Sequence, residues 1–150
     1  MESKQVTREE RIQFIRGDKG EVLPTVENFY KFCAERRLMA VKCRNCGTIL
    51  CPPRGLCPKC FTSSLEWTEL KREGKLLTYT IIHFPPSQFQ ALAPYAVGIA
   101  KLTGGPKLPG MIKNTKLESL KIEMELEVDF ETTVPKGWPR WPRYFFKPVE

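Results

Sequence analysis

Two pairs of cysteines constrain the fold of this 150-residue chain more than any other feature. Cys43 and Cys46 form one pair, Cys57 and Cys60 form the other, and ten residues separate the pairs. Two cysteines three positions apart on a tight turn direct both sulfur atoms toward one centre, and Gly47 suits the positive φ of such a turn. Two facing turns complete a tetrahedral site with metal–sulfur bonds of about 2.3 Å. Because sulfur fills all four positions, we expect a structural metal.

The metal predicted for this site is Zn²⁺. Iron in a rubredoxin-like site is the competing interpretation, because ligand spacing alone does not separate the two metals. A disulfide framework is the other alternative, and it is typical of secreted chains. The first residues carry charges of both signs and lack the apolar segment of a signal peptide, so we expect a cytoplasmic protein with a metal site. The remaining cysteines, Cys33 and Cys51, are expected to be buried and unreactive.

A short amphipathic helix is predicted before the cysteine pairs. Thr25 is a suitable N-cap residue, and Phe29, Phe32 and Cys33 follow the i, i+3, i+4 spacing of a helical apolar face. Two arginines then suit the negative end of a helix dipole. The pattern therefore predicts a helix over residues 26–37.

After the second cysteine pair the hydrophobic pattern changes to the period of two that is typical of β-strands. About five strands with glycine-marked turns, within about 80 residues, favour a small closed antiparallel barrel, of which the OB-fold is the commonest design. The strands are expected over residues 67–72, 75–84, 95–102, 110–113 and 121–131. In the last strand, the residues expected to face inward are Ile122, Met124, Leu126, Val128 and Phe130.

The sequence thus predicts a mainly β protein in three parts. The parts are an N-terminal helical segment over residues 1–40, a rubredoxin-like zinc ribbon over residues 41–66, and a five-stranded OB-fold barrel with a C-terminal tail over residues 67–150. The longest apolar run covers only residues 95–100, far short of the roughly 20 residues of a membrane helix, so we expect no membrane association.

The net charge of +7 raises the alternative of nucleic-acid binding. The excess positive charge lies in residues 41–66 and 134–150, whereas residues 67–133 hold eight basic and eight acidic residues. A binder of single-stranded nucleic acid needs a positive groove along its barrel. The charge distribution therefore disfavours this alternative, which predicts a steep salt dependence of single-strand binding.

The order of these parts resembles the DUF35 family, whose members carry an N-terminal helix, a rubredoxin-like zinc ribbon and an OB-fold associated with acyl-CoA. The resemblance extends over roughly residues 27–131. The motifs that carry it are Phe29-Tyr30, Arg37-Leu38, Cys43-Arg-Asn-Cys46-Gly47, Pro52-Pro53-Arg54, Cys57-Pro58-Lys59-Cys60, Gly74-Lys75-Leu76-Leu77-Thr78-Tyr79-Thr80, and the segment from Pro94 to Leu102.

This resemblance implies a partner protein. Members of the family are typically small companions of thiolase-like enzymes, and one archaeal companion is similar to a bridge between acetoacetyl-CoA thiolase and HMG-CoA synthase. By resemblance we expect a non-catalytic scaffold subunit that binds acyl-CoA and a thiolase-like or HMG-CoA synthase-like enzyme. The sequence itself contains one histidine and no legible Ser/His/Asp set or glycine-rich phosphate loop, so an enzyme acting alone is not expected.

Two sets of residues are candidates for these interactions. Coenzyme A carries phosphate groups, so a binder needs basic side chains, although solvated strand faces are the alternative explanation for such residues. The candidates for coenzyme A binding are Lys71, Arg72, Lys101 and His83. Residues 1–22 and the Pro-rich tail have no evident place in a ribbon or barrel, so we expect them to contact the partner. The tail residues expected at that interface are Trp138, Arg140, Trp141, Tyr144 and Phe145.

Overall fold

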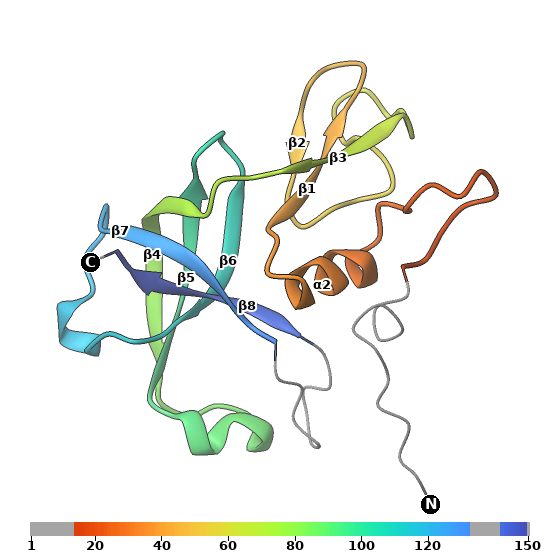
Figure 1. Ribbon diagram of the computed structural model, residues 1–150. Coiled ribbons are helices and arrows are strands. Elements are labelled where there is room, and N and C mark those ends of the chain that lie inside the picture. The colour runs from red at the N-terminus through yellow and green to blue at the C-terminus, as the bar shows by residue number, and fades with distance from the viewer. Residues whose placement is uncertain (1–13, 133–141, 150) are drawn as a thin grey trace, which may run out of the picture.

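The computed structural model describes residues 14–132 and 142–149. Within these residues the chain forms a small sheet, a barrel, and one α-helix that lies between them (Figure 1). The predicted interface residues Trp138, Arg140 and Trp141 lie outside the described residues. The elements are, in chain order, α2 (Val26–Ala34), β1 (Met39–Cys43), β2 (Ile49–Leu50), β3 (Leu65–Glu69), β4 (Glu73–Ile82), η1 (Ser87–Leu92), β5 (Tyr95–Leu102), β6 (Lys107–Ile112), η2 (Leu117–Ser119), β7 (Glu125–Glu131) and β8 (Arg143–Pro148).

Helix α2 begins as the sequence predicts and ends earlier. The Thr25 side chain accepts a hydrogen bond of 3.1 Å from the amide of Asn28, which satisfies a free N–H group of the first turn. The predicted helix extends to residue 37, but the observed helix ends at Ala34. Arg36 adopts a left-handed conformation, with φ of 58°, and this conformation does not continue a right-handed helix.

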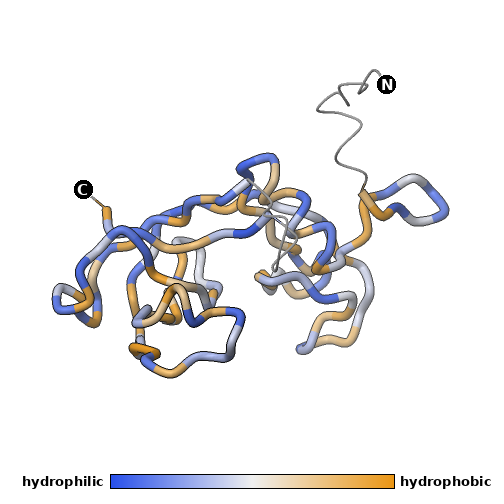
Figure 2. Tube along the Cα trace, turned by 90° about the horizontal axis from the view of Figure 1, so that it is seen from below, coloured by the Kyte–Doolittle hydropathy of each residue, from blue (hydrophilic) through white to orange (hydrophobic). Residues whose placement is uncertain are grey.

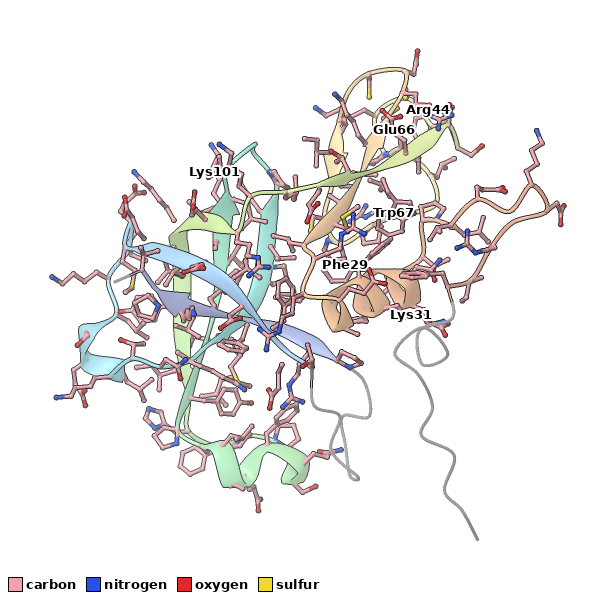
Figure 3. All side chains as sticks on the ribbon, in the orientation of Figure 1. Phe29, Lys31, Arg44, Glu66, Trp67 and Lys101 are labelled. Carbon is pink, nitrogen blue, oxygen red and sulfur yellow. The ribbon has the colours of Figure 1, made fainter. Side chains whose placement is uncertain are left out.

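The N-terminal sheet has the strand order β2-β1-β3. Strand β3 pairs with β1 over its full length, from Met39 opposite Glu69 to Cys43 opposite Leu65. The prediction that residues 67–72 form the first barrel strand is therefore wrong, because this strand completes the ribbon sheet instead. Its Trp67 ring packs against Phe32 of α2, with a centroid distance of 4.9 Å, and this contact fixes β3 beside the helix (Figure 3).

The barrel closes in the order β4-β5-β6-β8-β7, and β7 pairs with β4. Its fifth strand is β8, which the sequence analysis assigns to the tail. Phe146 of β8 is fully buried, and buried and more exposed residues alternate along β5 and β7. Figure 2 shows hydrophobic and hydrophilic residues interspersed along the chain. The predicted fold class, a mainly β protein with a helix, a zinc ribbon and a five-stranded barrel, is confirmed, although the strands that form the barrel differ from those predicted.

The predicted alternation over residues 121–131 is correct only in its second half. Leu126, Val128 and Phe130 are buried, as predicted. Ile122 is 52% exposed, and Met124 is only partly buried. Residues 122–123 form a turn in which Glu123 has φ of 72°, so β7 begins at residue 125 and the inward register does not reach Ile122. Leu120, just before this turn, is buried instead.

One apolar core joins the helix, the ribbon and the barrel. Phe29 of α2 is fully buried and contacts the Tyr144 ring of β8 at a centroid distance of 5.7 Å. Cys33 and Cys51 belong to the same core, as predicted, and burial raises the pKa of each thiol to about 12. Neither cysteine is therefore a reactive thiolate at neutral pH. In the described part of the chain, no helix is long and apolar enough to cross a lipid bilayer.

Candidate functional site

The first cysteine pair lies on a tight turn between β1 and β2. The Cys43 carbonyl accepts a hydrogen bond of 3.0 Å from the amide of Gly47, and the Cys43 amide donates one of 2.9 Å to the carbonyl of Thr48. Gly47 has φ of 77°, the left-handed conformation that the sequence pattern predicts for it. These bonds hold the sulfur atoms of Cys43 and Cys46 on the same side of the turn.

The second cysteine pair repeats this turn without a glycine. The Cys57 carbonyl accepts a hydrogen bond of 2.9 Å from the amide of Phe61, and the Cys57 amide donates one of 3.0 Å to Thr62. Phe61, the counterpart of Gly47, has φ of 57° and a residue exposure of 73%. A bulky residue in the left-handed region is unusual, so the turn itself imposes this conformation.

The two turns bring all four cysteine sulfurs within 4.8 Å of one another. The Sγ–Sγ distances are 3.4 Å from Cys43 to Cys60, 3.5 Å from Cys46 to Cys57, and 3.8 Å from Cys46 to Cys60. A tetrahedral site with metal–sulfur bonds of about 2.3 Å has sulfur–sulfur edges of about 3.8 Å. The donor set therefore fits one metal ion, and four sulfur ligands leave no position for a water molecule.

Local hydrogen bonds favour the thiolate form of the first pair. The amide of Cys46 lies 3.5 Å from the Cys43 sulfur and lowers the pKa of that thiol. The Thr48 hydroxyl lies 3.1 Å from the Cys46 sulfur and lowers the pKa of that thiol to about 6. Because the thiolate is the form that binds metals, these donors prepare the turn for a cation.

The structure does not bring the four predicted coenzyme A residues together. Lys101 lies on β5 beside a cleft of about 670 Å³, which the acidic side chains of Glu73, Glu123 and Glu125 also line. His83 follows the opposite end of β4, about 25 Å along the strand, and borders a separate cleft of about 280 Å³. These positions define no single phosphate site.

The other two predicted coenzyme A residues lie in the link between the ribbon sheet and the barrel. Lys71 is exposed there. The Arg72 guanidinium donates a hydrogen bond of 2.6 Å to the Arg36 carbonyl and lies 5.0 Å from the centre of the Phe130 ring. Arg72 thus connects the end of α2 to the barrel, a role in folding that the sequence analysis did not identify.

The two described members of the predicted partner interface belong to barrel strand β8. The Tyr144 hydroxyl donates a hydrogen bond to the Pro109 carbonyl, and burial raises the pKa of Tyr144. The Phe145 ring lies 5.1 Å from the ammonium group of Lys113. The expectation that the tail has no place in the barrel is therefore wrong for residues 143–148, and deleting the tail would remove a barrel strand. An interface role for Tyr144 and Phe145 stays a prediction.

Asn28 is a structural residue that the sequence analysis missed. It is fully buried, accepts a hydrogen bond of 2.7 Å from the amide of Ile15, and donates to the carbonyls of Ile15 and Leu23 at 2.8 Å each. The Trp67 indole donates a further bond of 2.8 Å to Val22, so the segment before α2 is held against the helix and the ribbon sheet. In the sequence, the only indication of this structural role is that Asn28 is a polar residue next to the apolar face of the helix.

Four sulfurs on a ribbon sheet, next to a closed five-stranded barrel, define the class of zinc-ribbon proteins with an OB-fold. Two family models match the chain: the rubredoxin-like zinc ribbon domain of ChsH2 over residues 31–66, and the C-terminal OB-fold domain of ChsH2 over residues 67–131. A DUF35 domain-containing scaffold protein of Methanocaldococcus jannaschii is 36% identical over 116 residues, which are 75% of this chain and 82% of that protein. The chain therefore belongs to the DUF35 family.

Other proteins share this similarity. A DUF35 domain-containing scaffold protein of Pyrococcus furiosus is 33% identical over 69% of this chain and 76% of its own length. A probable enoyl-CoA hydratase alpha subunit of Thermomonospora curvata is 28% identical over 77% of this chain, which spans only 37% of that subunit. Among solved structures, the Ltp2-ChsH2(DUF35) aldolase superposes with a TM-score of 0.68 and 26% identity, covering 81% of this chain and 91% of that one.

Proposed function

We propose that this chain is a non-catalytic scaffold subunit of a cytoplasmic enzyme complex, and that it associates with a thiolase-like enzyme that processes acyl-CoA. Membership of a family whose archaeal relatives are named scaffold proteins is the observation that carries this proposal. The matched aldolase contains a ChsH2 (DUF35) chain, and another relative is named as a subunit of a probable enoyl-CoA hydratase. The first name supports a place beside an enzyme, and the second supports an enzyme that acts on an acyl-CoA.

A more specific form of the proposal is a bridge between acetoacetyl-CoA thiolase and HMG-CoA synthase. The division of the chain into a ribbon, a barrel and an N-terminal segment supports it, because separate surfaces can hold separate partners. In this form the pair of chain and enzyme binds acyl-CoA better than either does alone. The scattered positions of Lys101 and His83 favour an acyl-CoA site completed by the enzyme over one formed by this chain alone.

The metal proposed for the four-cysteine site is Zn²⁺. Cys43, Cys46, Cys57 and Cys60 would hold the ion, and it would supply a rigid link between the two turns. The ion has a structural role in this proposal, since sulfur fills the coordination sphere. Elemental analysis that finds iron in place of zinc, or X-ray absorption that finds fewer than four sulfur ligands, would contradict it.

The outer face of the barrel disfavours the alternative of a single-stranded nucleic-acid binder. In OB-folds, nucleic acids bind across the face that the second and third barrel strands form, and bases stack there on aromatic rings. The outward residues in the middle of β5 and β6 are Val97, Ile99, Pro109 and Met111, none of which is aromatic. The middle of this face therefore offers no stacking platform, and the outward aromatic residue of β5, Tyr95, lies at the first position of the strand and packs against Phe89 at a centroid distance of 6.0 Å.

Co-purification from the native cell, followed by identification of the partner, tests the proposed function. We expect a thiolase-like enzyme to elute with this chain in size-exclusion chromatography, and we expect no turnover of acyl-CoA by the isolated chain. Titration calorimetry with coenzyme A thioesters then compares the chain, the enzyme and the pair. The proposal fails if the isolated chain turns over acyl-CoA, or if it binds single-stranded nucleic acid in a salt-sensitive way and no thiolase-like enzyme.

A further inference from the structure

Three lysines lie side by side on the outer face of the barrel. Lys75 of β4 is directly opposite Lys101 of β5, and Lys101 is directly opposite Lys107 of β6. All three are exposed, and Figure 3 shows Lys101 near the end of the barrel that carries the β5–β6 turn. Like charges directly opposite one another on neighbouring strands destabilise a sheet, so this row opposes the stability of the barrel.

None of these lysines forms an ion pair within the described residues, although other lysines of the chain do. Lys31, Lys113 and Lys147 each lie within 3.4 Å of a carboxylate oxygen. Glu125 of β7 is the residue opposite Lys75 on the other side, but its side chain forms no ion pair with that lysine. No carboxylate of the described residues therefore contacts these ammonium groups directly, although Glu73, Glu123 and Glu125 line the same cleft as Lys75 and Lys101.

An uncharged apolar surface continues directly from this lysine row. The next two outward positions on each strand are Thr78, Ile99 and Pro109, and then Thr80, Val97 and Met111. They line an open cleft of about 530 Å³, and Ile99 is 38% exposed. Helix α2 packs against β7 and β8, so it does not cover this face. We call these six residues and the three lysines the β4–β6 face.

We propose that the β4–β6 face is the surface that docks the partner enzyme, and that the enzyme presents apolar side chains bordered by carboxylates. This inference rests on the proposed function and names the surface that it uses. An apolar patch with a charged border is typical of protein-binding surfaces. The unpaired lysines are complementary to acidic groups, which would steer association and fix its orientation.

The chemistry of the face favours a protein over the phosphates of a small ligand. Strand β5 is paired with β4 along one edge and with β6 along the other, so its backbone N–H groups do not converge on an anion. No arginine, which would bind phosphate with two parallel bonds, lines the cleft next to the lysines. Its aromatic residue, Tyr79, packs against the core and donates a hydrogen bond from its hydroxyl to the Leu120 carbonyl. The open cleft would also leave most of a small ligand in water, whereas ligand pockets bury about 70–90% of a ligand's surface.

Matched substitutions test this surface with the thiolase-like enzyme identified by co-purification. One variant combines Lys75→Glu, Lys101→Glu and Lys107→Glu, and its control combines Lys19→Glu, Lys116→Glu and Lys121→Glu, with the same change of charge at exposed lysines elsewhere. A second pair is Ile99→Arg and its control Ile122→Arg, at isoleucines that are 38% and 52% exposed. We expect each face variant to weaken binding at least tenfold, and each control less than twofold.

Two further measurements test whether the group that binds this face is an acidic protein surface. Raising the salt concentration should weaken wild-type binding and strengthen binding of the lysine variant, because screening reduces an attraction in the first case and a repulsion between glutamates and the enzyme's carboxylates in the second. Carbodiimide treatment of the wild-type complex should link the three lysines to aspartate or glutamate of the enzyme. Circular dichroism confirms that each variant is folded before binding is compared.

The outcomes distinguish this inference from the proposed function. If wild type binds the enzyme and both face variants bind equally well, the docking surface is wrong and the scaffold function stands. If the lysine variant loses affinity for coenzyme A but not for the enzyme, the row binds phosphate and the inference is wrong. If wild type binds no thiolase-like enzyme, the proposed function fails and the inference fails with it.

Discussion

The ribbon and the barrel are stabilised in different ways, although one core joins them. The ribbon sheet includes a strand of only two residues, β2, and both of its cysteine turns lie near the surface. The barrel buries large side chains on every strand, among them Leu76, Leu108 and Phe146. A unit as small as the ribbon cannot bury enough apolar surface to fold on its own, so it depends on its metal. The barrel depends on side-chain packing.

Removing the metal should therefore have the largest effect, and it should act on the ribbon. Cys57→Ser removes a fully buried ligand, and binding of structural Zn²⁺ contributes apparent free energies of about 10–16 kcal/mol in zinc-finger peptides. We expect the variant to lose its metal and the order of residues 43–66, while the barrel stays partly folded. Metal content by mass spectrometry and amide exchange of the two regions measure this.

Cys33→Ala is the control for that substitution, because Cys33 is an equally buried cysteine outside the metal site. It should retain one metal ion per chain. A Cys57→Ser variant whose barrel amides exchange as fast as its ribbon amides would show that the two regions unfold together and that the contrast between them is wrong.

A matched pair, one residue on β7 and one in the turn before it, tests the packing of the barrel. Leu126 is 1% exposed, so Leu126→Ala should cost about 2–5 kcal/mol of the free energy of unfolding. Ile122 is 52% exposed, so Ile122→Ala should cost less than about 0.5 kcal/mol. Denaturant unfolding monitored by circular dichroism gives both values. Equal losses for the two variants would mean that the turn at residues 122–123 does not set the register of β7.

The two cysteine turns differ at one residue, and this difference should have a smaller effect. A left-handed conformation costs a residue with a side chain roughly 1–2 kcal/mol relative to glycine. Phe61→Gly should therefore stabilise the second turn by about 1 kcal/mol, and Gly47→Ala should destabilise the first turn by a similar amount. Competition with a metal-binding chromophore measures both as changes in metal affinity. A loss of affinity in Phe61→Gly would mean that the exposed ring stabilises its turn.

Acid should have the smallest effect, and it should act on the barrel. Burial alone would raise the pKa of Asp129, but the Phe130 amide and Lys147 outweigh it, and the pKa is lowered overall. The pKa of Glu131 is also lowered, because Lys113 and Arg143 outweigh the effect of burial, which alone would raise it. A carboxyl group whose pKa is lower in the folded chain stabilises the fold above its unfolded pKa, and this stability is lost as the pH falls through the folded pKa.

The expected decrease in the free energy of unfolding at acid pH is below about 1 kcal/mol for each carboxylate, because both groups are partly exposed. Thermal unfolding between pH 7 and pH 3 measures it, and Asp129→Asn should reduce the slope below about pH 4. An unchanged slope in this variant would mean that the ion pairs across β7 and β8 contribute nothing to the stability of the barrel.

Local patterns in the sequence predicted the four-cysteine cluster and the start of the helix correctly. The spacing of Cys43, Cys46, Cys57 and Cys60 specifies two turns, and each turn is closed by hydrogen bonds between residues four or five apart. The N-cap at Thr25 is equally local. Features of this kind need no information about distant parts of the chain, so the sequence alone contains them.

The tertiary structure alone decided which strands pair. Trp67 belongs to a strand with the same alternating pattern as the barrel strands, but its contact with Phe32 and its pairing with β1 place it in the ribbon sheet. Strand β8 is the fifth barrel strand in its place. Its Phe146 side chain fills the barrel core beside Gly110, where any side chain at residue 110 would collide with the Phe146 ring. A period of two predicts a strand but not its neighbour, because strand pairing is selected by packing between residues far apart in the sequence. The lysine row on the β4–β6 face became visible only once that register was known.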